Sequence, residues 1–94
     1  MASTFADKRT ERFASGHRVP AFSGIEAQAH RRLFVLRNAL NLAALRGLQS
    51  NRLEALKGDR VGQYSIRINN QCRICFEWPE GDPEPSNIQI VDYH

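Results

Sequence analysis

Residues 56–78 read LKGDRVGQYSIRINNQCRICFEW, and this stretch decides the fold. Apolar and polar residues alternate through both of its halves, which is the two-residue period of strands with one buried face. Between the halves, Asn69, Asn70 and Gln71 are typical of a turn, because asparagine tolerates positive φ and bonds to its own backbone. The stretch therefore predicts a β-hairpin. Its apolar members are Tyr64, Ile66, Ile68, Cys72, Ile74, Phe76 and Trp78.

The length of the turn follows from the requirement that cross-strand partners share a face. A two-residue turn would place Ile66 opposite Arg73 and mix the two faces. A three-residue turn pairs Ile66 with Ile74 and keeps one face wholly apolar. It also places Arg67 directly opposite Arg73 on the other face, where like charges repel. Two explanations are open: the arginines splay into water, or an anion lies between them.

The size and charge of the chain limit its class. Its 94 residues suit a single domain spanning residues 1–94, and its formal net charge is +3. Mild basicity favours a nucleic-acid or acidic-protein partner without choosing between them. No apolar run approaches the roughly 18 residues of a membrane span, and the N-terminus lacks the apolar region of a signal peptide. We therefore expect a cytoplasmic protein with no membrane partner.

Cys72 and Cys75 have the spacing of a metal or redox motif, but they lie on a predicted strand. Residues three apart on a strand point to opposite faces, so these thiols can neither chelate one zinc ion nor bond to each other. No second cysteine pair or nearby histidine completes a tetrahedral site. We expect no metal, no cofactor and two reduced thiols, with Cys72 the more buried because it belongs to the apolar face.

A long helix is predicted before the hairpin. Ser23 and Glu26 have the spacing of a capping box, and Gly47 is placed to end the helix. A helix of about 22 residues would be ~33 Å long and would cover one side of a small sheet. Its basic residues fit either a solvated face or contact with phosphates or an acidic partner. The apolar stripe consists of Ile25, Ala29, Leu33, Leu36, Leu40 and Ala43 or Ala44.

The remaining elements are shorter. Residues 2–5 are a candidate edge strand and residues 7–13 a candidate helical turn, while residues 52–54 and 87–91 are candidate strands. Short connections between successive strands favour antiparallel neighbours. The sequence therefore predicts an α+β fold in which a small antiparallel meander sheet is packed on one face by a long helix plus a short N-terminal helix.

Three motifs together resemble a known family. The LKGDRVG loop at residues 56–62, the RICF strand at residues 73–76 and the terminal VDYH at residues 91–94 look like the HigB branch of the RelE superfamily. The resemblance extends over most of the chain. One departure is Cys72, which stands where the family commonly has tryptophan, and we interpret it as a change of core volume.

The resemblance implies both a fold and a function. The members of this family are toxins of bacterial type II toxin–antitoxin modules, with a RelE-like microbial RNase fold. It implies a metal-independent endoribonuclease, an mRNA interferase that cuts codons in the ribosomal A site. It also implies two partners, the ribosome with mRNA in its A site and a helix-turn-helix antitoxin of the HigA type.

The resemblance also assigns candidate site residues. Lys57 and Arg73 match the catalytic cations of the family, and Asp92, Tyr93 and His94 match its terminal active-site residues. The candidate RNA-binding residues are Arg60, Arg67 and Arg73.

These residue types suit RNA cleavage without a metal, which needs a base for the 2′-hydroxyl, an acid for the 5′-oxygen and cations for the negative charge that develops on the phosphate. Arg73 and Arg67 can grip phosphate oxygens through planar forks, and Lys57 offers a point charge. His94 titrates near neutrality and can move a proton, oriented by Asp92 or Tyr93. Which group is the base and which the acid stays open.

Two other functions stay open at this point. One is a catalytically silent module that keeps the fold and binds the antitoxin or RNA. The other is a general RNA-binding domain outside toxin–antitoxin systems, which the sparse aromatic residues of the open face disfavour.

Overall fold

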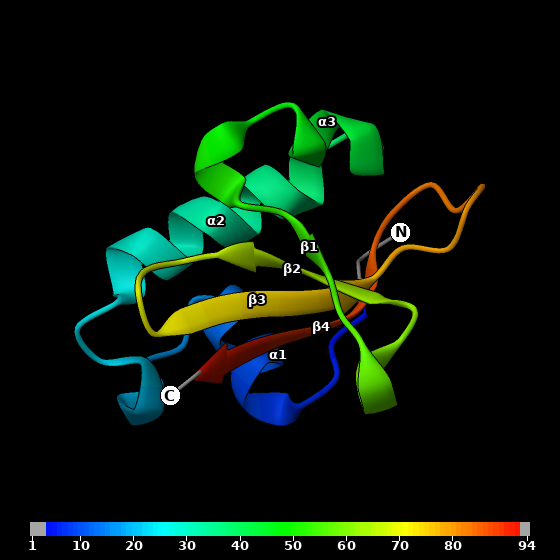
Figure 1. The fold of residues 1–94 in the computed structure, drawn as a ribbon. Helices are drawn as coiled ribbons and strands as arrows, with labels where there is room; N and C mark the ends of the chain where they lie inside the picture. The colour runs from blue at the N-terminus through cyan, green and yellow to red at the C-terminus, as the bar shows by residue number, and fades with distance from the viewer. Residues whose placement is uncertain (1–3, 93–94) are drawn as a thin grey trace.

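The computed structural model describes residues 4–92. Figure 1 shows a β-sheet beside one long helix and several shorter helical segments. The helices are α1 (Lys8–Ala14), α2 (Glu26–Asn38) and α3 (Leu42–Arg46), and the 3₁₀ turns are η1 (Pro20–Phe22), η2 (Gln49–Asn51) and η3 (Gly58–Arg60). The strands are β1 (Glu54–Ala55), β2 (Gln63–Arg67), β3 (Cys72–Glu77) and β4 (Ser86–Asp92).

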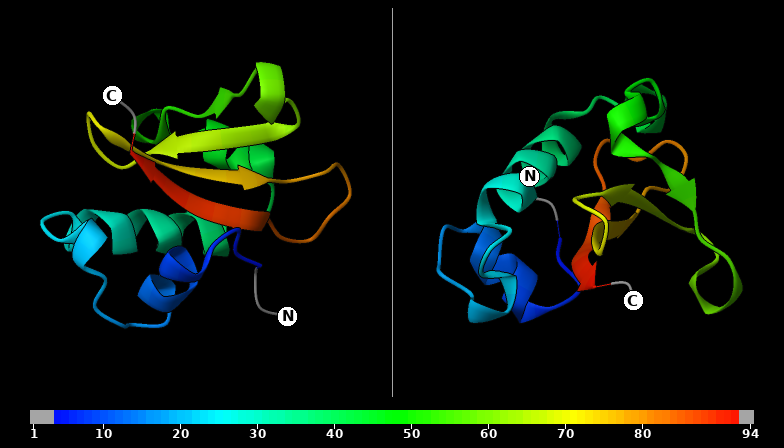
Figure 2. Two further views of the ribbon diagram at one scale, coloured as in Figure 1. Left: turned by 90° about the horizontal axis from the view of Figure 1, so that it is seen from below. Right: turned by 60° about the vertical axis from the view of Figure 1, so that its left-hand side comes forward.

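The four strands form one sheet in the order β1-β2-β3-β4, and every neighbouring pair is antiparallel. This is the predicted meander. The helices α1 and α2 lie on the same side of it, as the two views of Figure 2 show. The predicted α+β fold is therefore confirmed, with one face of the sheet covered by helices.

The hairpin has the predicted register. Ile66 pairs with Ile74, Tyr64 with Phe76, and Arg67 with Arg73. The turn is closed by a hydrogen bond of 2.9 Å from the Ile68 amide to the Cys72 carbonyl. Asn69 makes the tight reversal itself, because its Oδ1 accepts the amides of residues 71 and 72, each at 2.8 Å.

The core lies between the apolar face of the sheet and the helices. Every one of its main members is almost completely buried, which contributes roughly 1.5–3 kcal/mol for each large side chain. The central members are Phe13, Ala29, Leu33, Leu36, Leu45, Ile66, Ile74, Phe76, Ile88 and Ile90.

The predicted single long helix is wrong, because the chain breaks into α2 and α3 at residues 39–41. Ala39 is extended, and the Asn41 side chain accepts the Ala44 amide at 2.9 Å, which makes Asn41 the N-cap of a new helix. Leu40, predicted to face the core, is 85% exposed in the break. Gly47 does end a helix, but that helix is α3.

The predicted capping box is also wrong. The N-cap of α2 is Ile25, whose side chain makes no capping bond. Glu26 instead accepts the Gly24 amide at 3.2 Å. Gly24 has a φ of +90°, a left-handed conformation that suits glycine and turns the chain between Ser23 and α2, so Ser23 does not cap the helix.

The N-terminal segment keeps only part of the predicted strand. Phe5 forms a single parallel bridge to Ile88 in β4, and residues 2 and 3 lie outside the described range. The predicted helical turn is α1, whose N-cap Asp7 accepts the Thr10 amide at 2.9 Å. The hydroxyl of buried Thr10 accepts the Ile90 amide at 3.1 Å and so ties α1 to the edge of β4.

Both cysteines are reduced, but the prediction of which is buried is wrong. Cys75 is 1% exposed, whereas Cys72 is half-buried. Cys75 lies in the middle of the sheet between its partners Ser65 and Gln89, while Cys72 is the first residue of β3. Within residues 4–92, no group of three or more histidine, cysteine, aspartate or glutamate side chains is placed to hold a metal ion. None of the described helices is long and apolar enough to cross a bilayer.

Candidate functional site

An open groove lies on the sheet face that carries Arg67 and Arg73. Its volume is about 650 Å³, and three of its seven lining residues are arginines. We call this hollow the arginine groove. It is lined by Arg52, Leu53, Glu54, Arg67, Asn69, Asn70 and Arg73.

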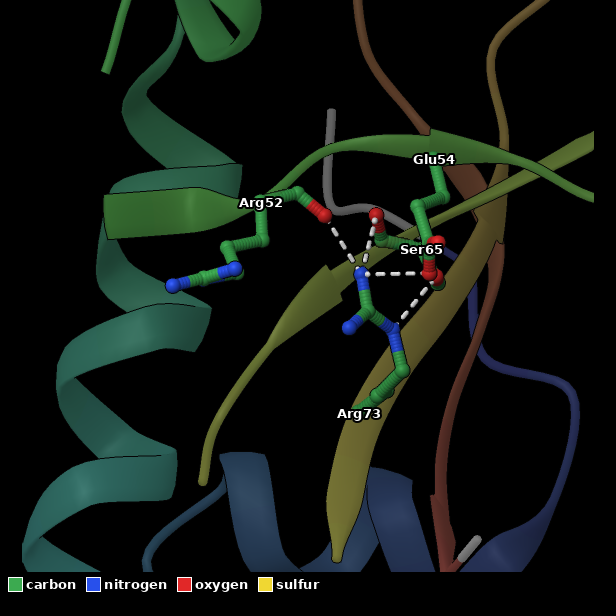
Figure 3. A network of polar contacts seen from close by, with 4 residues as sticks. All are labelled: Arg52, Glu54, Ser65 and Arg73. Atoms are coloured by element: carbon green, nitrogen blue, oxygen red, sulfur yellow. Dashed lines mark hydrogen bonds and ion pairs between the residues drawn. The ribbon is translucent and has the colours of Figure 1, made fainter. Parts of the chain in front are cut away.

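Arg73 forms part of the groove lining and is held from one side (Figure 3). Its Nε donates to Ser65 Oγ at 2.7 Å. Its Nη2 lies 3.2 Å from Glu54 Oε1 and also donates to the carbonyls of Arg52 and Ser65. The Arg73 side chain is only 12% exposed, against 64% for Glu54. The guanidinium is therefore pre-oriented by the protein.

The carbonyl of Arg52 reaches Arg73 because the chain turns sharply at that residue. Arg52 follows η2 in a left-handed conformation with a φ of 46°. The preceding residue, Asn51, is completely buried, accepts from Arg32 Nη1 at 2.8 Å and donates to the Leu45 carbonyl at 3.0 Å. Helices α2 and α3 therefore anchor the turn that presents Arg52 to the groove.

The two opposed arginines turn to different acceptors. Arg73 reaches Ser65, Glu54 and the Arg52 carbonyl, whereas Arg67 Nη2 donates to the Asn70 side chain in the hairpin turn. The protein itself supplies one anion, Glu54, so the like-charge repulsion across the hairpin is relieved without a bound ligand.

Lys57 and Arg60 are not brought into the groove. The Leu56 amide bonds to the Gln63 carbonyl at 2.9 Å, so Lys57 lies beside the end of β2 that is farther from Arg67. At the rise of a strand, the backbones of Gln63 and Arg67 are ~13 Å apart. Arg60 is half-buried and donates to Gln63 Oε1 at 3.3 Å. Figure 2 shows η3 at the opposite end of the sheet from the last residues of β4.

Asp92 lies on the other face of the sheet from Arg73. It pairs with Cys72, whereas Arg73 pairs with Val91, and neighbouring residues of a strand point to opposite faces. With Cys72, Arg9 and Phe22, Asp92 lines a separate small hollow. Burial raises the pKa of the Cys72 thiol, and the negative charge of Asp92 raises it further. The predicted residues Tyr93 and His94 lie outside the described range.

Three residues that hold the Arg73 side chain are not singled out by the sequence analysis: Arg52, Glu54 and Ser65. Glu54 and Ser65 carried a usable signal, since they are cross-strand partners on the polar face that Arg67 and Arg73 share. The Arg52 carbonyl carried none, because its direction depends on a left-handed backbone conformation that arginine rarely adopts.

The fold is shared with a solved toxin structure. A solved structure described as the YoeB/ParE toxin from Agrobacterium tumefaciens matches with a TM-score of 0.60 over 100% of both chains. The sequences are 15% identical, so this likeness concerns the fold alone. The class comes from a family model that matches residues 3–94, and it is that of the RelE-like toxins.

Sequence comparisons narrow the class to one family. The family model described as the RelE-like toxin of the type II toxin–antitoxin system HigB matches residues 3–94. Toxin HigB-1 of Vibrio cholerae serotype O1 is 39% identical over 84 residues, covering 86% of this chain and 87% of that protein. The chain belongs to the HigB-like family of type II toxins, as the sequence motifs indicated. Membership implies an antitoxin as partner.

Proposed function

We propose that this toxin is an endoribonuclease that cuts mRNA in the ribosomal A site and so stops translation and growth. The observation that carries the proposal is the pre-oriented guanidinium of Arg73 in a groove lined by two further arginines. A rigid planar fork in such a setting suits a phosphate, which it can bind through two parallel hydrogen bonds.

The reaction we propose is an internal transfer at phosphorus. The 2′-oxygen of the RNA loses its proton to a base and forms a bond to the phosphorus, while the bond from phosphorus to the 5′-oxygen breaks. The 5′-oxygen takes a proton from an acid, which leaves a 2′,3′-cyclic phosphate and a 5′-hydroxyl. Arg73 and Arg67 stabilise the negative charge that grows on the phosphate oxygens.

The family resemblance assigns the proton transfers to the end of the chain. In this scheme His94 moves the proton. Tyr93 and Asp92 orient the His94 side chain or shape its surroundings. Lys57 adds a positive charge for the RNA backbone at the far end of β2. Because these groups do not all line the groove, we propose that the ribosome supplies the substrate geometry that the free toxin lacks.

The proposed partners are the ribosome with mRNA in its A site and a helix-turn-helix antitoxin of the HigA type. Both act in the cytoplasm, which is where we propose that this toxin works. Antitoxin binding would neutralise a toxin whose basic surface is otherwise available to RNA.

Inducible expression in a bacterium tests the proposal. We expect the wild-type chain to arrest growth, Arg73→Ala to abolish the arrest, and Arg12→Ala, which removes an exposed arginine on α1, to leave it unchanged. Equal growth with wild-type and Arg73→Ala proteins at equal abundance would contradict the proposal.

One observation favours a second function. Arg73 Nη2 is already engaged by Glu54 and two carbonyls, and Asp92 lies on the opposite face. A catalytically silent module that binds only the antitoxin would have such an occupied arginine. That protein would bind its antitoxin and produce no growth arrest when expressed alone.

A further inference from the structure

We infer that Ser65 is a positioning residue for Arg73: its hydroxyl fixes the guanidinium so that the Nη1–Nη2 edge is the one that receives the phosphate. This inference rests on the proposed function, because it concerns the orientation of the group that we propose binds the substrate.

The three nitrogens of the Arg73 guanidinium have different hydrogen-bond partners. Nε donates to Ser65 Oγ at 2.7 Å, and Nη2 faces Glu54 Oε1 and two carbonyl oxygens. Among residues 4–92, nothing accepts a hydrogen bond from Nη1, which points away from Ser65 and Glu54 in Figure 3. A phosphate that approaches from the groove therefore meets Nη1 first.

A bound phosphate would replace some contacts of the Arg73 guanidinium and leave others in place. Two parallel bonds to a phosphate use either the Nη1–Nη2 edge or the Nε–Nη2 edge of the guanidinium. The Ser65 hydroxyl occupies Nε, which leaves the Nη1–Nη2 edge for the ligand. On that edge Nη1 has no acceptor within residues 4–92, whereas Nη2 has three. Binding there takes Nη2 from one of its three acceptors, of which Glu54 is the charged one, and leaves the bond from Nε to Ser65 intact. Ser65 thus differs from Glu54, which competes with the ligand.

The surroundings of Ser65 also favour a positioning role for its hydroxyl. Ser65 is completely buried in the middle of β2, where a β-branched or apolar residue would suit a strand better. A buried hydroxyl needs a hydrogen-bond partner, and Arg73 Nε provides one that carries charge. Since this bond is partly buried, it holds the guanidinium more firmly than a solvent-exposed contact would.

The test measures binding of the full chain to a short 2′-O-methyl RNA oligonucleotide, which the enzyme is unable to cleave. We expect Ser65→Ala to weaken binding about tenfold, the usual worth of a hydrogen bond to a charged group. Ser65→Thr keeps the hydroxyl and should restore binding to within about threefold of wild type. In the Arg73→Ala background, Ser65→Ala should have no further effect, because both changes remove one coupled unit.

A spectroscopic signature separates positioning from general damage. The Nε–H proton of Arg73 should give a protected resonance in the wild-type protein that is lost in Ser65→Ala while the thermal midpoint and the amide spectrum stay close to wild type. If Ser65→Ala does not fold, Ser65→Cys serves instead, since a thiol of similar size is a weak acceptor. The same loss of binding is then expected.

The binding and growth measurements distinguish a failure of the Ser65 inference from a failure of the proposed function. If Arg73→Ala weakens RNA binding and Ser65→Ala does not, the inference is wrong and the proposed function stands. If Ser65→Ala weakens binding equally in the wild-type and Arg73→Ala backgrounds, Ser65 acts independently of Arg73 and the inference is also wrong. If Arg73→Ala leaves binding unchanged, Arg73 does not hold the phosphate in the complex and the inference is wrong, whereas the proposed function fails only if Arg73→Ala also keeps the growth arrest.

Discussion

Glu54 is an internal competitor for the phosphate at the scale of single residues. Its carboxylate is 64% exposed and lies 3.2 Å from Arg73 Nη2. Because exposed ion pairs stabilise proteins by only about 0.2–1 kcal/mol, solvent readily replaces such a contact. The pair orders Arg73 in the free protein without binding it tightly.

We therefore predict that Glu54→Gln strengthens binding of the 2′-O-methyl RNA oligonucleotide by roughly two- to fivefold, the equivalent of an exposed ion pair. The measurement is a titration followed by fluorescence anisotropy. Glu11→Gln, which removes an exposed carboxylate on α1, controls for the change in net charge. Weaker binding by the Glu54 variant would show that the carboxylate supports the ligand rather than competing with it.

Cys72 offers a test of the geometry at the end of β4. Its pKa is raised chiefly by burial and additionally by Asp92, so the thiol stays protonated at a pH where a free cysteine is partly thiolate. We predict that iodoacetamide modifies Cys72 more slowly than it modifies free cysteine near pH 8, and that Asp92→Asn speeds the reaction.

The raised pKa of Cys72 also makes the stability of the folded protein depend on pH. A pKa raised in the folded state stabilises the protein fully below the unfolded pKa, and this stabilisation is lost as the pH rises through the folded pKa. An unchanged alkylation rate in Asp92→Asn would mean that the carboxylate does not act on the thiol. The change should be modest, since burial is the larger cause.

The break between α2 and α3 shows what sequence patterns reveal at the scale of elements. The apolar stripe predicted the buried face of α2 correctly through Leu36. The stripe continues through Leu40, because the spacing of apolar residues does not reveal that a helix ends and a new one begins. The signal that was available is Asn41, a favoured N-cap residue in the middle of the predicted helix.

The substitution Asn41→Ala distinguishes a helix break capped by Asn41 from one continuous helix through this segment. With Asn41 as an N-cap, the substitution removes the bond to the Ala44 amide and destabilises the protein by about 1 kcal/mol. In one continuous helix the same substitution would stabilise it by roughly half a kcal/mol, because alanine is the better helix former. Urea denaturation measures the difference, with Leu40→Gln in the same exposed segment as a nearly neutral control.

The hairpin was predictable in detail, whereas the groove was predictable only in part. Face parity alone set the three-residue turn and the opposition of Arg67 and Arg73. The acceptors of Arg73 depend on β1, a two-residue strand too short to leave a periodic pattern. They depend also on the left-handed conformation of Arg52, which three-dimensional anchoring through Asn51 supports.

Across the whole molecule, the candidate RNA-binding cations are distributed along the length of the sheet. Arg52, Arg67 and Arg73 share the arginine groove, while Lys57 lies outside it beside the far end of β2. This spacing suits an extended strand of RNA that meets several phosphates in succession better than a small anion. Each cation then contributes to binding through release of counterions.

We predict that Lys57→Ala weakens binding of the 2′-O-methyl RNA oligonucleotide and lowers the slope of log Kd against log salt by about 0.7, the value for one contact to a single-stranded phosphate. Affinities measured across a salt series give this slope. Arg12→Ala, on the helical side, should leave the slope unchanged. An unaltered slope for the Lys57 variant would place Lys57 outside the RNA path.

The proposed mechanism requires that Arg73 stabilise the scissile phosphate of a ribosome-bound message. Primer extension on an mRNA in a reconstituted translation reaction tests it most directly, with wild type, Arg73→Ala and Arg12→Ala compared in the presence and absence of ribosomes. We expect cuts within codons that require ribosomes, persist in Arg12→Ala and fall by at least about 100-fold in Arg73→Ala, as is usual when a group that stabilises transition-state charge is removed. Intact message at wild-type concentrations that saturate ribosome binding, or undiminished cleavage by Arg73→Ala, would contradict it.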